Sequence, residues 1–171
     1  NGIWMAGAVV VAVSPLMVTG EVSPLLRSTG CKLVIGLDLL LPQLFEGEYK
    51  PEKVLVTSLK DRLPLLQRLG YSIAKIARLG IRRRACDDRC LDFFAELVQG
   101  NPDFEPVQNG SLDDPAFILP TGGTTAAPKA VVLSHRNLVA NAWQLHHWGG
   151  ATMAQETVLA VVPFFHSYGL T

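Results

Sequence analysis

Thr121-Gly122-Gly123-Thr124-Thr125-Ala126-Ala127-Pro128-Lys129 is rich in glycine and threonine and ends in a lysine. It directly follows a short apolar run, residues 116–119, which is typical of a buried strand. Glycines let the backbone approach a ligand and point successive N–H groups at it, and threonine hydroxyls add further donors. A lysine adds a compact positive charge. The stretch therefore predicts a loop that binds a polyphosphate. It differs from the common P-loop, because no Gly-Lys pair occurs in the sequence.

Further segments accompany this loop in a fixed order. Upstream lie the apolar run 6–16 and the segment 28–35, and downstream lies Val162-Pro163-Phe164-Phe165-His166-Ser167-Tyr168-Gly169-Leu170. The loop itself leads into Ser134-His135-Arg136-Asn137, a helix start. Together these elements resemble the adenylate-forming, AMP-binding superfamily, which includes acyl-CoA synthetases, luciferases and the adenylation domains of peptide synthetases. Within it, the likeness is greatest to medium- and long-chain fatty acyl-CoA synthetases, that is, fatty acid–CoA ligases.

The resemblance implies an enzyme that uses ATP to activate a fatty acid to an acyl-adenylate and then to acyl-CoA. It implies that His166 is catalytic and lies beside the reacting carboxylate and the α-phosphate. Phe164 and Phe165 would form part of the wall of the acyl pocket. His135 is expected to be structural, and His146-His147 to lie on a helix surface. The β- and γ-phosphates of ATP would be bound by Thr121, Gly122, Gly123, Thr124, Thr125 and Lys129.

Other implied parts fall outside this sequence. No segment matches the motifs that supply the family's magnesium-binding glutamate and ribose-binding aspartate, so no metal ligand is assigned here. The mobile C-terminal domain is absent as well. We therefore expect the chain to be an internal piece, residues 1–171, of the large N-terminal domain, and to be inactive alone. Ala126 and Ala130 stand where the family usually has glycine, and the consequence for loop closure is left open.

Two alternatives to a fatty acid–CoA ligase stay open. The first is an acyl-AMP ligase that loads a carrier protein in place of CoA. The second is a non-catalytic module that binds nucleotide or docks on a membrane. The sequence does not predict the acyl chain length or the oligomeric state.

Composition narrows the class of protein. The 15 basic and 15 acidic residues cancel, which argues against a general nucleic-acid binder. No run is long enough for a transmembrane helix, and no signal peptide is apparent, so a cytoplasmic location is expected. Three cysteines, Cys31, Cys86 and Cys90, are interpreted as incidental thiols, the last two sharing a helix face.

The periodicities predict an α/β fold of βαβ units with a mostly parallel sheet. We expect strands at 9–13, 33–36, 54–57, 131–133 and 158–162, and the first two are predicted to pair in parallel around a helix capped by Thr19. Further helices are predicted at 91–98 and 134–148. The chain is divided into a βαβ segment (1–58), a basic helical segment (59–100), a loop (101–115) and a phosphate-loop and active-site segment (116–171).

The segment 60–84 has eight basic residues and one acidic residue, a net charge of +7. Its apolar residues recur at helical spacing. One interpretation is a surface helix on the body of the enzyme. The alternative is a basic amphipathic helix in peripheral contact with an anionic membrane, at its inner face and near the source of fatty acid. The apolar residues are Leu63, Leu66, Leu69, Ile73 and Ile76.

Overall fold

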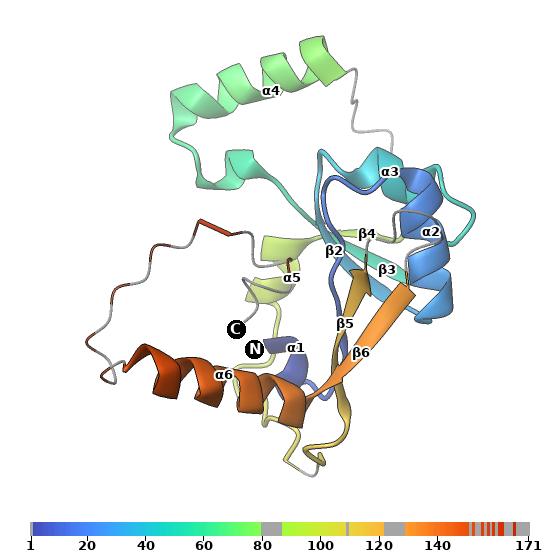
Figure 1. Cartoon of the computed structure of the whole chain (residues 1–171). Helices are drawn as coiled ribbons and strands as arrows, with labels where there is room; N and C mark the ends of the chain where they lie inside the picture. Colours follow the sequence, from blue (N-terminus) through green and yellow to red (C-terminus); the bar gives the residue numbers. More distant parts are fainter. Residues whose placement is uncertain are drawn as a thin grey trace. The chain divides into compact units, whose positions relative to one another are not determined.

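The computed structural model describes residues 2–79, 87–108, 110–121 and 129–150, and residues 152, 155, 157, 159, 161, 162 and 166. The chain divides into two compact units (Figure 1). One unit comprises Asn1–Leu16 and Phe104–Thr171, and the other comprises Met17–Asp103. We call them the outer-segment unit and the central unit, because the first is built from both ends of the chain.

The central unit is built on a parallel sheet in the order β2-β3-β4. The strands are β2 (Leu33–Leu37), β3 (Lys53–Thr57) and β4 (Cys90–Asp92). Val54, at the centre of this sheet, is fully buried. Helix α2 (Thr19–Ser28) precedes β2, α3 (Leu41–Phe45) connects β2 to β3, and α5 (Phe93–Val98) follows β4. The 3₁₀ turn η1 (Leu59–Arg62) and α4 (Leu65–Leu79) lie between β3 and β4.

Helix α2 follows from its sequence pattern. Val22, Leu25 and Leu26 recur at helical spacing and are buried, as is expected for the side of a helix that faces a core. The Glu21 carboxylate accepts a hydrogen bond from the Val18 N–H at 3.1 Å, so Val18 caps the helix and the prediction of Thr19 as the cap is wrong. Gly30 follows the helix with φ of 60°, a conformation that favours glycine.

The carboxyl ends of β2 and β3 carry a buried polar cluster. The Ser58 hydroxyl donates to the Asp38 carboxylate at 2.7 Å, and both residues are more than nine-tenths buried. The Ser58 N–H donates to the Asp61 carboxylate at 2.9 Å, which starts η1. The Tyr71 hydroxyl, on α4, donates to the other Asp38 oxygen at 3.4 Å. Asp38 therefore links the carboxyl ends of β2 and β3 to α4. Burial, followed by the charge of Asp38, raises the pKa of Tyr71.

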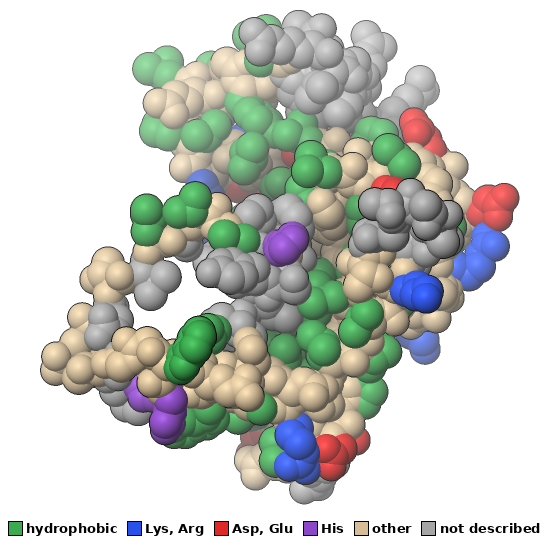
Figure 2. Space-filling model, in the orientation of Figure 1, with side chains coloured by type: hydrophobic (Ala, Val, Ile, Leu, Met, Phe, Trp, Pro, Cys, Tyr) green, Lys and Arg blue, Asp and Glu red, His purple; other side chains and the backbone are tan. Residues whose placement is uncertain are grey.

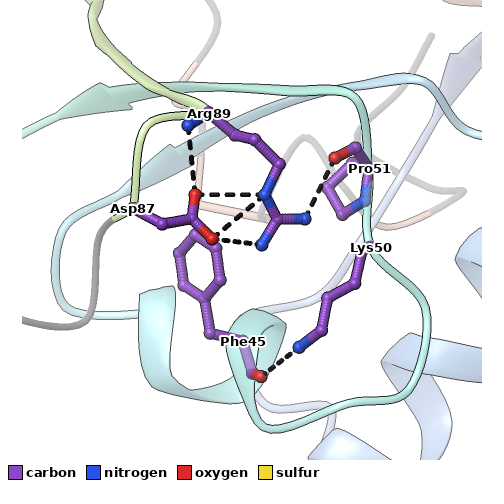
Figure 3. A network of polar contacts seen from close by, with 5 residues as sticks. All are labelled: Phe45, Lys50, Pro51, Asp87 and Arg89. Carbon is purple, nitrogen blue, oxygen red and sulfur yellow. Dashed lines mark hydrogen bonds and ion pairs between the residues drawn. The ribbon is translucent and has the colours of Figure 1, made fainter.

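Arg89 makes a group of polar contacts at the amino ends of β3 and β4, opposite the carboxyl ends that carry Asp38 and Ser58 (Figure 3). The Arg89 guanidinium donates to the Asp87 carboxylate and, at 3.2 Å, to the Pro51 carbonyl. Its charged end also lies 5.4 Å from the centre of the Phe45 ring, while Lys50 Nζ donates to the Phe45 carbonyl at 2.6 Å. These contacts join the residue before β4 to α3 and to the start of β3. The hydrogen bond from Arg89 is the main cause that lowers the pKa of Asp87.

Asp87→Asn is expected to lower the thermal unfolding midpoint of the chain by a few degrees at pH 7. The pKa of Asp87 is lowered in the folded state, so its contribution is present above the unfolded value of about 3.9 and is lost as pH falls through the folded value. Circular dichroism melts from pH 7 to pH 2.5 should show the two curves converge at the acid end. Asp103→Asn, which alters an exposed carboxylate of the same unit, is the control. A difference that stays constant below pH 3 would contradict this origin.

The outer-segment unit is built on the sheet order β1-β5-β6. Strand β1 (Val10–Val11) is parallel to β5 (Pro115–Thr121), and β5 is antiparallel to β6 (Lys129–Ser134). Helix α6 (His135–Gly149) follows β6 directly, and α1 (Gly2–Met5) precedes β1. The core of the unit is a cluster of Ala12, Phe117 and Leu119.

The α/β class with mostly parallel strands is confirmed, but the first predicted pairing is wrong. The strands near 9–13 and 33–36 belong to different sheets: β1 pairs with β5, and β2 pairs with β3. The reason is that β1 pairs with a strand far away in the sequence. The chain leaves the first unit after Leu16 and returns to it only at Phe104, so the partner of β1 lies about a hundred residues away in sequence.

Expectations about the helix at 91–98, Cys90 and the strand at 158–162 are also corrected. Cys90 begins a strand that pairs with β3, so the predicted helix at 91–98 starts only at Phe93 and Cys90 does not lie on a helix face. Cys90 is disulfide-bonded, which overturns its interpretation as an incidental thiol, whereas Cys31 is free. Of the strand predicted at 158–162, the described residues 159, 161 and 162 are not in a strand, and 158 and 160 lie outside the described residues.

The basic segment is helical, as its periodicity predicts: α4 covers Leu65–Leu79, and residues 80–84 lie outside the described part. Across the residues that the structure describes, no helix combines the length and the apolar character that a membrane span requires.

Candidate functional site

The predicted phosphate loop joins the two antiparallel strands β5 and β6. Strand β5 is anchored by its apolar side chains, since Ala116 is fully buried and Phe117 and Leu119 are 6% and 8% exposed. Trp4 reinforces it from α1: its indole N–H donates to the Ala116 carbonyl at 2.8 Å, and its ring packs edge-on against Phe117. The loop therefore follows a buried and well-anchored strand. Because β5 pairs with β6, this strand fixes the position of both ends of the loop.

The two ends of the loop lie directly opposite each other. Thr121 and Lys129 are register partners in the β5–β6 ladder, and the Thr121 hydroxyl donates to the Lys129 carbonyl at 3.2 Å. Directly opposed residues of an antiparallel pair project from the same face of the sheet. Both side chains are exposed at the base of the loop. Ala130, where the family usually has glycine, pairs with Pro120 within the strands.

The other residues predicted to bind phosphate, Gly122, Gly123, Thr124 and Thr125, lie outside the described residues, as does Ala126. So do Phe164 and Phe165. His166 lies in an exposed bend. The structure therefore brings together two of the predicted site residues, Thr121 and Lys129, and the placement of His166 beside them stays a prediction.

Helix α6 starts immediately after β6 and continues the same structural unit. The Ser134 hydroxyl accepts from the Asn137 N–H at 3.3 Å, and the Asn137 side chain accepts from the Ser134 N–H at 2.9 Å. This reciprocal cap is the one predicted from Ser134, and the helix ends as predicted at Gly149, with Gly150 at φ of 61°. Strand, cap and helix together hold the downstream end of the loop.

His135 is structural, in agreement with the sequence prediction. The backbone N–H of His135 donates to the Asp114 carbonyl at 3.2 Å, and its ring packs edge-on against Trp4. His147 lies on the exposed surface of α6, where its ring nitrogen contacts the Trp143 carbonyl at 3.1 Å.

A salt bridge that sequence reasoning missed holds the approach to β5 against α6. The Arg136 guanidinium forms two hydrogen bonds with the Asp113 carboxylate, at 2.7 and 3.0 Å, and the Arg136 N–H donates to the Leu112 carbonyl at 2.8 Å. Arg136 lowers the pKa of Asp113, chiefly through the hydrogen bond. No local signal predicts the pair, because the two residues are 23 positions apart and meet only when β5 and β6 form a hairpin.

The fold and this loop define a class of protein. All of residues 1–171 match the family model of the AMP-binding enzymes, and the chain belongs to that family. The long-chain-fatty-acid–CoA ligase of Bacillus subtilis (strain 168) is 33% identical to it over 184 residues, which cover 99% of this chain and 31% of that protein. A long-chain-fatty-acid–CoA ligase of Escherichia coli O6:H1 is 28% identical over 182 residues, with the same coverage. The chain thus spans under a third of the length of these curated relatives.

Solved structures agree on the fold. An acyl-CoA synthetase from Brucella canis matches 99% of this chain with a TM-score of 0.72 at 20% identity, and 26% of that chain is covered. A second match is a long-chain-fatty-acid CoA ligase, described as putative, from Rhodopseudomonas palustris, with a TM-score of 0.68 at 15% identity over 98% of this chain and 35% of that one. At such low identities the likeness establishes the α/β fold alone.

Proposed function

We propose that this chain is part of the N-terminal domain of a larger enzyme that uses ATP to activate a long-chain fatty acid as its CoA thioester. The observation that carries the proposal is the pairing of Thr121 with Lys129 at the base of the loop. The exposed Lys129 therefore lies at the base of the loop, opposite the end of a buried strand, in a chain whose family is AMP-binding. The relatives named as long-chain-fatty-acid–CoA ligases support the fatty acid as the substrate class.

The reaction explains why such a loop is needed. A carboxylate oxygen of the fatty acid attacks the α-phosphorus of ATP, and the bond from this phosphorus to the β-phosphate bridging oxygen breaks, releasing pyrophosphate. The thiol of CoA then attacks the acyl carbon, loses its proton and expels AMP. In the first step two anions must meet, so positive charge and aligned donors must lower the barrier. Lys129 would supply such a charge, and the backbone N–H groups of Gly122 and Gly123 and the hydroxyls of Thr124 and Thr125 would supply donors.

The remaining roles follow the same proposal. His166 would donate to the reacting carboxylate or to the α-phosphate, and Phe164 and Phe165 would line the acyl pocket. The Mg²⁺ that accompanies ATP would be bound by residues outside this chain, as would the ribose. Cytoplasmic location is part of the proposal.

Two other functions compete with it. In a carrier-protein ligase the acyl-adenylate would be transferred to a carrier-bound thiol in place of CoA. In a non-catalytic module, nucleotide would bind without any reaction. No observation on the described residues favours either over the CoA ligase, whereas the relatives' names favour the ligase.

The full-length protein is expected to catalyse pyrophosphate–ATP exchange that depends on a long-chain fatty acid, followed by acyl-CoA formation when CoA is added. Exchange measured with labelled pyrophosphate tests the first step, and chromatography of the products with CoA or with a carrier protein tests the second. Nucleotide binding without exchange would support the non-catalytic module and overturn the proposal. The 171-residue chain alone, tested in parallel, should show no exchange, because half a site cannot orient two substrates.

A further inference from the structure

Strand β5 contains one extra residue opposite β6. Pro115 lies opposite Ser134 in the antiparallel ladder. The next pair is Phe117 opposite Leu133, so two steps along β5 match one step along β6. Ala116 is the extra residue, and this irregularity is a β-bulge. A bulge shifts the register of every pair that follows it along the two strands.

The bulge determines which residue lies opposite Lys129. In the observed register, Lys129 pairs with Thr121. If the ladder continued from Pro115 without the bulge, every pair would slip by one residue and Lys129 would lie opposite Pro120. The slip would move Lys129 by about 3.4 Å along β5 and turn its side chain to the other face of that strand. The geometry at the base of the loop therefore depends on the bulge.

The loop and the side-chain pattern specify this register only weakly. The connection at residues 122–128 is longer than the short turns that set the register of tight hairpins. Residues 116–119 and 130–133 are continuous apolar runs, so a slip by one residue exchanges one apolar side chain for another. Val131 and Val132, on opposite faces of β6, are both exposed, and Figure 2 shows hydrophobic side chains on the surface in the region of β5 and β6. Contacts at the bulge are therefore expected to decide the register.

Trp4 makes these contacts. Its indole N–H donates to the carbonyl of Ala116 at 2.8 Å. Ala116 is fully buried, so water cannot replace the indole as the donor. The Trp4 ring also packs edge-on against Phe117, directly after the bulge, and against His135, directly after β6, with ring centres 6.4 and 6.2 Å apart. Trp4 thus satisfies the carbonyl of the bulge and contacts the chain on both sides of the hairpin.

Helix α1 holds Trp4 in this position. The Met5 carbonyl accepts a hydrogen bond from the Val107 N–H at 2.9 Å, which joins α1 to the segment that leads to β5. The Gly7 N–H donates to the Trp4 carbonyl at 2.9 Å, and Gly7 ends the helix with φ of 71°, a conformation that favours glycine. The indole is therefore fixed beside the bulge by contacts on its own backbone.

We infer that Trp4 is a positioning residue for the proposed ATP site. Its indole holds the bulge at Ala116 and thereby sets the strand register that brings Lys129 opposite Thr121. Trp4 acts through the strands and not by contact with a substrate. Its effect on ATP rests on the proposed function, in which Lys129 binds phosphate, whereas its effect on the register does not.

Cysteine cross-linking in the full-length protein measures the register directly. I118C/V132C joins strand partners of the observed register, whereas I118C/V131C joins residues that become partners only after the slip. Opposed residues lie close enough for a disulfide, but the neighbours of a partner project from the other face. With Trp4 present, mild oxidation should link the first pair and not the second. Trp4→Phe keeps a ring and removes the N–H, and it should shift the cross-link to the second pair, as identified by mass spectrometry.

ATP binding is the second measurement, made without the engineered cysteines. Trp4→Phe is expected to raise the ATP dissociation constant about tenfold and to change fatty-acid binding little, because leaving a buried acceptor without its donor disfavours the bulged register by a factor of about 5 to 150. Trp148→Phe is the matched control, since Trp148 is 95% exposed on α6, and it should change neither measurement.

Deletion of Ala116 gives an independent variant. It removes the extra residue, so a regular ladder from Pro115 then has the observed register without a bulge. The deletion should therefore preserve the I118C/V132C cross-link, and in the Trp4→Phe protein it should restore both this cross-link and ATP affinity. A residue that contributed only to general stability would not be rescued in this way.

The outcomes separate this inference from the proposed function. Unchanged cross-links in Trp4→Phe, or loss of both cross-links without rescue by the deletion, would overturn the inference whatever happens to ATP affinity. Shifted cross-links with unchanged ATP affinity would also overturn Trp4 as a positioning residue for ATP. In that case Lys129→Ala identifies the cause: if it also leaves ATP affinity unchanged, the proposed phosphate site has failed, and if it weakens ATP binding, only the role of the register has failed.

Discussion

Replacing Lys129 by alanine is expected to weaken ATP binding to the full-length enzyme by about 10- to 150-fold, while fatty-acid binding changes little. Lys129 is exposed and is the strand partner of Thr121 at the base of the loop, where its ammonium is proposed to bind a phosphate of ATP. Loss of one charge-assisted hydrogen bond costs about 1.5–3 kcal/mol, which corresponds to this range of affinities. Isothermal titration calorimetry with ATP and with a fatty acid gives both constants.

Lys53 offers a matched control for this experiment. Like Lys129, it is an exposed lysine at the first position of a strand, but it begins β3 in the other unit. Lys53→Ala should leave ATP affinity unchanged. Equal ATP affinities of the unmodified enzyme and Lys129→Ala would remove Lys129 from the phosphate site. Equal losses in both variants would show that the effect is one of general charge.

His166→Ala is expected to slow acyl-adenylate formation by about 100-fold with the ATP dissociation constant nearly unchanged. The proposed position of His166 is at the reacting carboxylate, so its contribution is made mainly in the transition state; removal of one such donor costs about 10²–10³ in rate. Pyrophosphate–ATP exchange at saturating fatty acid measures the rate, and calorimetry measures the affinity.

His147→Ala is the control for His166→Ala, because His147 lies on the exposed surface of α6 and contacts only its own helix among the contacts seen for it. Its exchange rate should match that of the unmodified enzyme. An unchanged rate in His166→Ala would return His166 to a structural role. A fall in ATP affinity that accounts for the whole loss of rate would place His166 at the nucleotide instead.

Local sequence signals predicted the elements that surround the phosphate loop. Ser134 and Asn137 form the predicted cap of α6 because both partners lie within one turn of helix. The apolar run before the loop forms the buried strand β5, because a short continuous apolar run is typical of a buried strand. The basic segment is helical because its apolar residues keep a helical period.

These local signals did not predict the contacts between residues far apart in the sequence. The partner of β1 is β5, and no feature of residues 9–13 distinguishes a partner twenty residues away from one a hundred residues away. The Trp4 indole donates to the Ala116 carbonyl only after the two ends of the chain have met, and Arg136 reaches Asp113 only after β5 and β6 have formed their hairpin. The first two residues of the helix predicted at 91–98 belong instead to β4, because pairing with β3 satisfies their backbone hydrogen-bonding groups in the sheet.

The sequence by itself determined the α/β class, the position between β5 and β6 of the loop that is proposed to bind phosphate, and the helical, amphipathic character of α4. Each of these depends on residue type and on spacing within one element, which physical chemistry relates directly to local structure. Only the tertiary structure decided that Thr121 and Lys129 are strand partners, that the chain forms two units, and that the apolar face of α4 points outward. These three depend on contacts such as that between Tyr71 and Asp38, which form between residues far apart in sequence and are governed by the packing of the whole unit.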